Sequence, residues 1–247
     1  MTIVYFVRHA QSDADWADDF SRPLTAAGAQ DRFAVMEFLK DKQVDSLYSS
    51  PYVRAMETLR PIAEEIEAGI EADYRLRERE SGLDAMSPGN LERRWTDHSY
   101  AETGGESLRS VQERNIECLH EILGNEEDKR TVIGTHGTAL STIWNYYDRS
   151  FGIRAFLGLL DLMPCVVRFS FEGNRLVEIQ KEFGIRKKYE GKNCVLESYR
   201  ANAMGDHGKE TAIASGSGFA SGREREIAAL TGAKARAEND EDPIPME

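Results

Sequence analysis

The stretch Ile3-Val4-Tyr5-Phe6-Val7-Arg8-His9 decides the fold. Its five apolar residues run without interruption, as is typical of a central parallel strand that is covered on both faces. The run then ends at a cation and an imidazole, Arg8 and His9. Because open parallel sheets bind ligands beyond the carboxyl ends of their strands, this end of the strand is where a site is expected.

Outward from this strand, short apolar runs alternate with longer segments of helical period as far as about residue 202, which predicts an α/β fold. Glu172-Gly173-Asn174 lies between two apolar runs and predicts a hairpin, which would give the mostly parallel sheet an antiparallel edge. The expected helices cover residues 25–40, 51–66, 106–123 and 138–147. The other expected strands cover residues 46–49, 131–134, 165–171 and 176–183, and a brief extended piece is expected near residues 70–76. Pro61 should kink or split the second helix.

The composition excludes several classes of protein. The 247 residues include 43 Asp and Glu against 31 Lys and Arg, a net charge of −12 that disfavours nucleic acid and anionic membranes as partners. No apolar run could span a membrane, and the opening stretch is too short for a signal peptide, so we expect a cytoplasmic protein. Three widely spaced cysteines fit neither a disulfide framework nor a zinc site. The sequence does not indicate an oligomeric state.

The end of the chain differs from the rest. Residues 205–247 contain six glycines and a single aromatic residue, Phe219, with nine acidic and five basic side chains. Such a composition cannot build a core. We therefore expect one domain over residues 1–204, followed by a flexible acidic C-terminal tail over residues 205–247.

A local basic cluster could still capture an anion against this acidic background. Arg8 and His9 end one strand, Arg54 falls in the first turn of a helix, and His136 follows another strand. Two guanidinium groups offer planar forks of donors for phosphate oxygens, and nearby helix N-termini add backbone amides. The pattern therefore predicts a site for a phosphate dianion.

The order and spacing of these residues resemble the histidine phosphatase superfamily, also called phosphoglycerate mutase-like, over about residues 1–185. The matching motifs are Arg8-His9-Ala10-Gln11-Ser12, Leu24-Thr25 with Gly28, Ser49-Ser50-Pro51 with Arg54-Ala55 and Glu57-Thr58, Leu76 with Glu78 and Gly82, Gly104-Gly105-Glu106-Ser107, and His136-Gly137. An Arg-His pair alone would be no evidence for this superfamily, whereas all of these motifs in this order are specific to it. The resemblance implies a three-layer α/β/α fold.

The resemblance also implies catalytic roles. His9 would be the nucleophile and pass through a phosphohistidine, and Glu78 would be the proton donor and then the base, with Glu57, Glu80 and Glu106 as nearby alternatives. Arg8, Arg54 and a protonated His136 would bind the phosphoryl oxygens of a small phosphorylated substrate. No metal and no cofactor is expected, because arginines beside the histidines would oppose a divalent cation.

Several alternatives compete with these assignments. Arg54 could instead form a salt bridge with Glu57 on a solvated helix face. Asp13, Asp15, Asp18 and Asp19 are expected to form a solvated acidic loop, although Asp15 stands where relatives often carry Asn and would repel phosphate if it pointed inwards. Arg93-Arg94-Trp95 could form either a solvated helix face or a lid that touches substrate.

The function expected from the sequence is a metal-independent phosphatase that acts on phosphomonoesters. A phosphoglycerate mutase is the alternative, disfavoured because only about 23 residues, 83–105, lie where mutases carry a longer water-excluding insertion. A non-catalytic phosphate- or protein-binding module is a third hypothesis.

Overall fold

One six-stranded sheet organises the chain in the computed structural model, which describes residues 1–85, 87 and 89–187. The strand order is β3-β2-β4-β1-β5-β6; β1 to β4 run parallel, whereas β5 and β6 are antiparallel. The strands are β1 Thr2–Arg8, β2 Ser46–Ser49, β3 Ile70–Ala72, β4 Arg130–Thr135, β5 Leu162–Glu172 and β6 Arg175–Arg186. The expected domain boundary and the tail over residues 205–247 lie outside the described residues.

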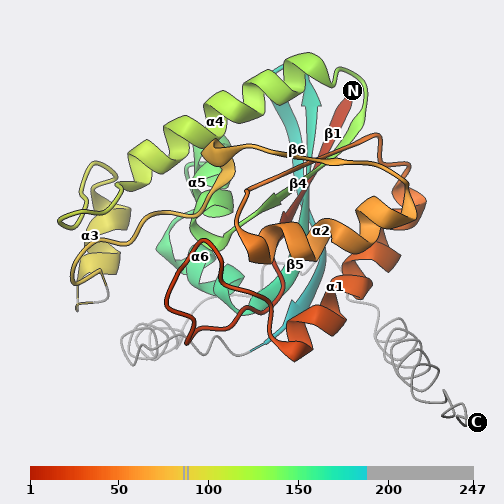
Figure 1. The fold of residues 1–247 in the computed structure, drawn as a ribbon. Helices are drawn as coiled ribbons and strands as arrows, with labels where there is room; N and C mark the ends of the chain where they lie inside the picture. The colour runs from red at the N-terminus through yellow and green to blue at the C-terminus, as the bar shows by residue number, and fades with distance from the viewer. Residues whose placement is uncertain (86, 88, 188–247) are drawn as a thin grey trace, which may run out of the picture. The chain divides into compact units, whose positions relative to one another are not determined.

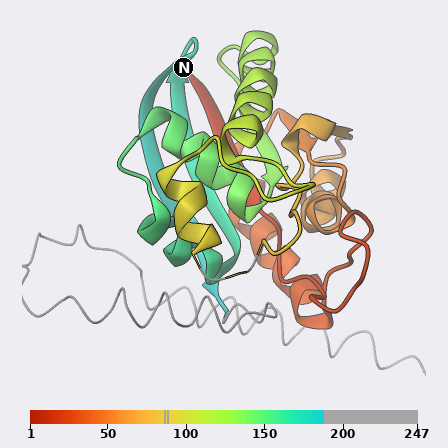
Figure 2. The same cartoon turned by 90° about the vertical axis from the view of Figure 1, so that its left-hand side faces the viewer.

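Helices cover both faces of the sheet (Figures 1 and 2). They are α1 Ala26–Leu39, α2 Val53–Glu65, α3 Asn90–Thr96, α4 Leu108–Asn125, α5 Gly137–Tyr147 and α6 Ile153–Leu160. Alternate residues of β1 enter two separate cores: Val4 and Phe6 pack on the side of α4 and α5, and Tyr5 and Val7 on the side of α1 and α2. The uninterrupted apolar run of β1 is thus explained, and the three-layer α/β/α fold with its antiparallel edge is confirmed.

Two local predictions need correction, and one helix was missed. The second helix begins at Val53 rather than at Pro51, and it continues through the buried Pro61 without splitting. Only residues 70–72 are extended, because the Asp73 side chain accepts a hydrogen bond from the backbone of Arg75 and begins a 3-10 turn over Tyr74–Leu76. Helix α6 was not predicted, because it has only eight residues, too few for a helical period to stand out from a short apolar run.

The register of the sheet places two histidines side by side. In the parallel pair of β1 and β4, Arg8 lies opposite Thr135, so His9 and His136 leave the same sheet edge from neighbouring strands. Ser49 of β2 pairs with Gly134 on the other side of β4, which brings the start of α2 to the same edge.

None of the helices in the described part of the chain has the length and apolar character of a membrane-spanning segment.

Candidate active site

A cavity of about 760 Å³ opens at the carboxyl ends of the parallel strands. Its wall combines side chains of both charges. The basic residues that line it are Arg8, Arg22, Arg54, Arg79 and Arg94, and the acidic ones are Asp13, Asp15, Asp19, Glu78 and Glu80. His9 also lines the cavity, although only 7% of its surface is exposed.

The His9 ring is oriented by its own backbone. Nδ1 lies 2.7 Å from the carbonyl oxygen of Ala10, an atom that can only accept, so Nδ1 carries the proton in a neutral ring. The other nitrogen, Nε2, then has the lone pair, and it accepts a hydrogen bond of 3.3 Å from Nε of Arg54. The structure therefore holds His9 in the tautomer whose nucleophilic nitrogen is next to a guanidinium.

The surroundings of His9 also keep it uncharged. Burial, followed by the charges of Arg54 and Arg8, lowers the pKa of His9 well below its ordinary value. A protonated imidazole has no lone pair for attack on phosphorus. His9 is therefore in its nucleophilic form at neutral pH.

Arg54 is buried against the site rather than on a solvated face. It is 2% exposed, and its Nη1 donates to the backbone oxygen of Asp19 at 2.6 Å, with Nη2 3.4 Å from the Asp19 carboxylate. Glu57 instead accepts a hydrogen bond from the backbone of Leu24. The alternative salt bridge between Arg54 and Glu57 is therefore wrong.

His136 lies beside His9, with ring centroids 5.3 Å apart, and is fully buried. Its Nε2 is 2.7 Å from the hydroxyl of Ser50. Burial, followed by the charges of Arg54 and Arg8, lowers the pKa of His136 well below its ordinary value. The ring is therefore neutral in this structure, because two guanidiniums surround a desolvated site. The expected protonation of His136 concerns the site with a phosphoryl group bound, and it stays a prediction.

Arg8 joins the site to a helix that the sequence pattern missed. Its Nη1 donates to the carbonyl oxygens of Leu159, Leu160 and Leu162, at 2.6 to 3.0 Å. These oxygens lie at the C-terminus of α6 and the start of β5, where a cation is favoured by the helix dipole. Arg8 also lines the cavity, so it combines a structural anchor with a positive charge near His9.

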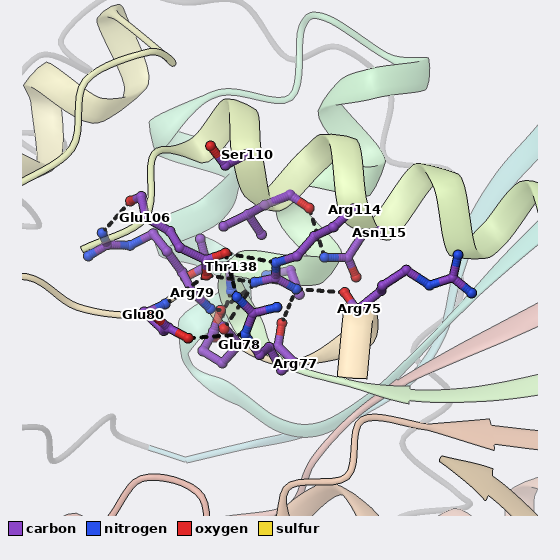
Figure 3. A network of polar contacts seen from close by, with 12 residues as sticks. Arg75, Arg77, Glu78, Arg79, Glu80, Glu106, Ser110, Arg114, Asn115 and Thr138 are labelled. Atoms are coloured by element: carbon purple, nitrogen blue, oxygen red, sulfur yellow. Dashed lines mark hydrogen bonds and ion pairs between the residues drawn. The ribbon is translucent and has the colours of Figure 1, made fainter. Parts of the chain in front are cut away.

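Glu78 lines the cavity and is attached to the start of α5. Its carboxylate accepts hydrogen bonds from the backbone amides of Thr138, Ala139 and Arg79, at 3.0, 3.2 and 2.7 Å. Figure 3 shows Glu78 and Thr138 together in this part of the site. Helix N-termini near the site were expected to offer backbone amides to the anion. At the start of α5, the amides of Thr138 and Ala139 instead bind the Glu78 carboxylate and orient it at the cavity wall.

The acidic loop is only partly as expected. Asp19 bridges two arginines, because its carboxylate also lies 2.9 Å from Arg22. Asp13 and Asp15 line the cavity, so the concern about a negative charge at position 15 stands. Among the described residues, no group of three His, Cys, Asp or Glu side chains could hold a metal ion.

A buried ion cluster in the cavity wall was not predicted. Arg79 and Arg94 both pair with Glu102, and all three side chains are almost fully buried. Arg94 lies on α3 and lines the cavity with Trp95, so this face of α3 is not solvated. The only sequence signal was the polar segment between Gly82 and Gly105, which did not show that Glu102 would lie between two cations.

The sequence profile of the histidine phosphatase superfamily (branch 1) matches residues 4–178, and the chain belongs to this superfamily. A "Probable phosphoglycerate mutase GpmB" of Proteus mirabilis is 27% identical over 157 residues, which span 58% of this chain and 73% of that protein.

Two solved structures show the same fold. A mycobacterial glucosyl-3-phosphoglycerate phosphatase is 20% identical with a TM-score of 0.59, over 73% of this chain and 96% of that one. A phosphoserine phosphatase of Entamoeba histolytica, solved with 3-phosphoglyceric acid, is 19% identical with a TM-score of 0.62, over 76% and 99% of the two chains.

Proposed function

We propose that the chain is a phosphatase that hydrolyses small phosphomonoesters through a phosphohistidine on Nε2 of His9. The observation that carries this proposal is the fixed tautomer of His9: Nδ1 bonds to the Ala10 carbonyl, and the Nε2 lone pair meets Arg54 at the cavity. Membership of the superfamily supports the same chemistry.

In the first step the Nε2 lone pair attacks phosphorus, and the bond between phosphorus and the alcohol oxygen breaks. Glu78, in its protonated form, supplies the proton that the leaving oxygen needs. Arg8 and Arg54 stabilise the charge on the equatorial oxygens, a contribution of about 2.7 to 4 kcal/mol for one well-placed donor. An arriving dianion also offsets the effect of the guanidiniums on His136, so that His136 can take up a proton and donate to the phosphate.

In the second step water attacks the phosphohistidine while the Glu78 carboxylate accepts a water proton. The nitrogen–phosphorus bond breaks, its electron pair returns to Nε2, and inorganic phosphate leaves. No metal ion is required in this proposal, because the cationic charge that a metal would contribute is supplied by Arg8 and Arg54 beside His9.

The test measures release of inorganic phosphate from a panel of phosphorylated metabolites by the wild type, His9→Ala and His120→Ala. His120 lies on α4 near Tyr147 and is the matched control. We expect activity in the wild type and in His120→Ala, with or without a chelator, and loss of at least about a hundredfold in His9→Ala. Equal activity in all three proteins would remove His9 as the nucleophile.

A mutase is the second candidate, favoured by the similarity to the GpmB protein. The two reactions share the phosphohistidine and differ in whether water or a second substrate hydroxyl takes the phosphoryl group. Incubation with 3-phosphoglycerate and a bisphosphate primer separates them: we expect inorganic phosphate to accumulate, whereas interconversion of the monophosphates would establish the mutase.

A further inference from the structure

Arg114, on the second turn of α4, binds the main chain that carries Glu78. Its Nη1 donates to the carbonyl oxygens of Arg75 and Arg77, at 2.6 and 2.8 Å, and its Nη2 to the carbonyl oxygen of Glu78, at 3.1 Å. Figure 3 shows this guanidinium reaching the backbone beside Glu78. Three carbonyls of one four-residue segment therefore point at a single side chain.

The remaining donors of Arg114 bind Glu106. Nε and Nη2 each lie 2.9 Å from one oxygen of its carboxylate. With these contacts Arg114 uses all five of its N–H groups, which a guanidinium holds in a fixed plane. The guanidinium therefore fixes the positions of the carbonyl groups of this segment. The ammonium group of a lysine, with three donors on a flexible chain, could not make the same contacts.

Glu106 holds the same segment from its other side. Its carboxylate accepts hydrogen bonds from the backbone amide of Glu80, at 3.0 Å, and from the Arg77 side chain, at 2.8 Å. Although burial raises the pKa of Glu106, its bonds to Arg114 and Glu80 outweigh this and keep the pKa below its ordinary value. Residues on both sides of Glu78 are thus attached to one ion pair, Arg114 with Glu106.

We propose that Arg114 is a positioning residue, which fixes the main chain so that the Glu78 carboxylate faces the leaving oxygen of the substrate. This inference rests on the proposed role of Glu78. Arg114 does not line the cavity, so we expect no direct contact between its side chain and a substrate bound there. Its effect is therefore expected in proton donation and not in the binding of phosphate.

The experiment compares kcat/KM for two substrates, because this parameter reports the transfer to His9 and not the later hydrolysis. Release of 4-nitrophenolate from 4-nitrophenyl phosphate needs little proton donation, whereas release of the alkoxide from glycerol 2-phosphate depends on it. General acid catalysis typically contributes about 10² to 10⁴-fold. We therefore expect Glu78→Gln to lower kcat/KM by at least about a hundredfold for the alkyl ester and much less for the aryl ester.

Arg114→Gln and Arg114→Lys should reproduce this selectivity. We expect kcat/KM for the alkyl ester to fall at least about tenfold, because a misplaced Glu78 loses part of the contribution of general acid catalysis. The fall in kcat/KM for the aryl ester should be smaller. Adding Arg114→Gln to Glu78→Gln should cause little further loss, because both changes remove the same contribution. Thermal unfolding of each variant reports the folded fraction.

Arg75→Gln is the matched control, because Arg75 ties the same segment to α4 through Glu117 and Glu121 without contacting the Glu78 backbone. It should lower both activities equally or not at all. Equal losses with the two esters in the Arg114 variants, while Glu78→Gln stays selective, would overturn this inference and leave the proposed function intact. An unselective Glu78→Gln would instead overturn the role of Glu78, and the positioning role with it.

Discussion

The two buried histidines should make the stability of the fold depend on pH in a defined window. His9 and His136 have pKa values well below normal in the folded protein, whereas an unfolded chain restores them to about 6.5. Below that pH the unfolded state binds more protons than the folded state. Acidification therefore favours unfolding, and stability rises as the pH rises towards neutrality.

The size of the effect follows from proton linkage. Between pH 7.0 and 5.5, each histidine that stays neutral in the folded state removes about 1.25 kcal/mol from the free energy of unfolding, or about 2.5 kcal/mol for the pair. Carboxylates contribute little in this window, because their ordinary pKa values in an unfolded chain lie near 4. The window thus separates the histidines from the acid titration of the ion pairs. Burial also lowers the pKa of His98, but the wild type and the site variants share this residue, so its contribution cancels in their comparison.

Urea denaturation at pH 7.0 and 5.5 measures this free energy directly. The wild type is compared with His9→Gln, His136→Gln and the double variant. Each single substitution should abolish about half of the pH-dependent loss attributed to the pair, and the double variant all of it. If the wild type and the double variant lose equal stability over this range, the two rings are not held neutral and the electrostatic account of the site is wrong.

Three further outcomes are expected. Arg54→Met should lower kcat/KM for phosphomonoesters by about 10² to 10³-fold, measured by phosphate release, because it removes the guanidinium beside His9. Gly28→Ala should destabilise the protein by about 1 to 3 kcal/mol in urea denaturation, since its Cβ would overlap the backbone oxygen of Gln11; an unchanged midpoint would contradict this close packing. Leu59 is fully buried between α2 and the sheet, so Leu59→Ala should lower the free energy of unfolding by about 2 to 5 kcal/mol in urea denaturation. A loss below about 1 kcal/mol would show that the neighbouring side chains move in to fill the space left by the leucine.

The sequence predicts the parts of the fold that depend on local periodicity. The apolar run before Arg8 and the cap at Thr25 each describe one element, and the Thr25 side chain indeed accepts a hydrogen bond from Gly28. The sequence also predicts that His9 and His136 lie close together, because both follow buried parallel strands, whose carboxyl ends share one edge of the sheet.

Contacts between distant segments leave no such pattern. Asp19 and Arg54 are 35 positions apart, and their contact depends on how the loop before α1 folds over the site. Arg114 binds main-chain oxygens, which every residue possesses, so its partners are not encoded by side-chain type. The lowered pKa of His136 could not be predicted either, because burial and the added charge of two guanidiniums appear only once the chain is folded.

The central claim, that Nε2 of His9 takes the phosphoryl group, is tested most directly by trapping the phosphoenzyme. Wild type and His9→Ala are mixed with a phosphorylated substrate, quenched in alkali within milliseconds, and analysed by peptide mass spectrometry and ³¹P NMR. The account predicts an alkali-stable, acid-labile phosphoryl group on Nε2 of His9, absent from the variant. A label on another residue, or turnover of substrate by the unlabelled variant at the wild-type rate, would contradict it.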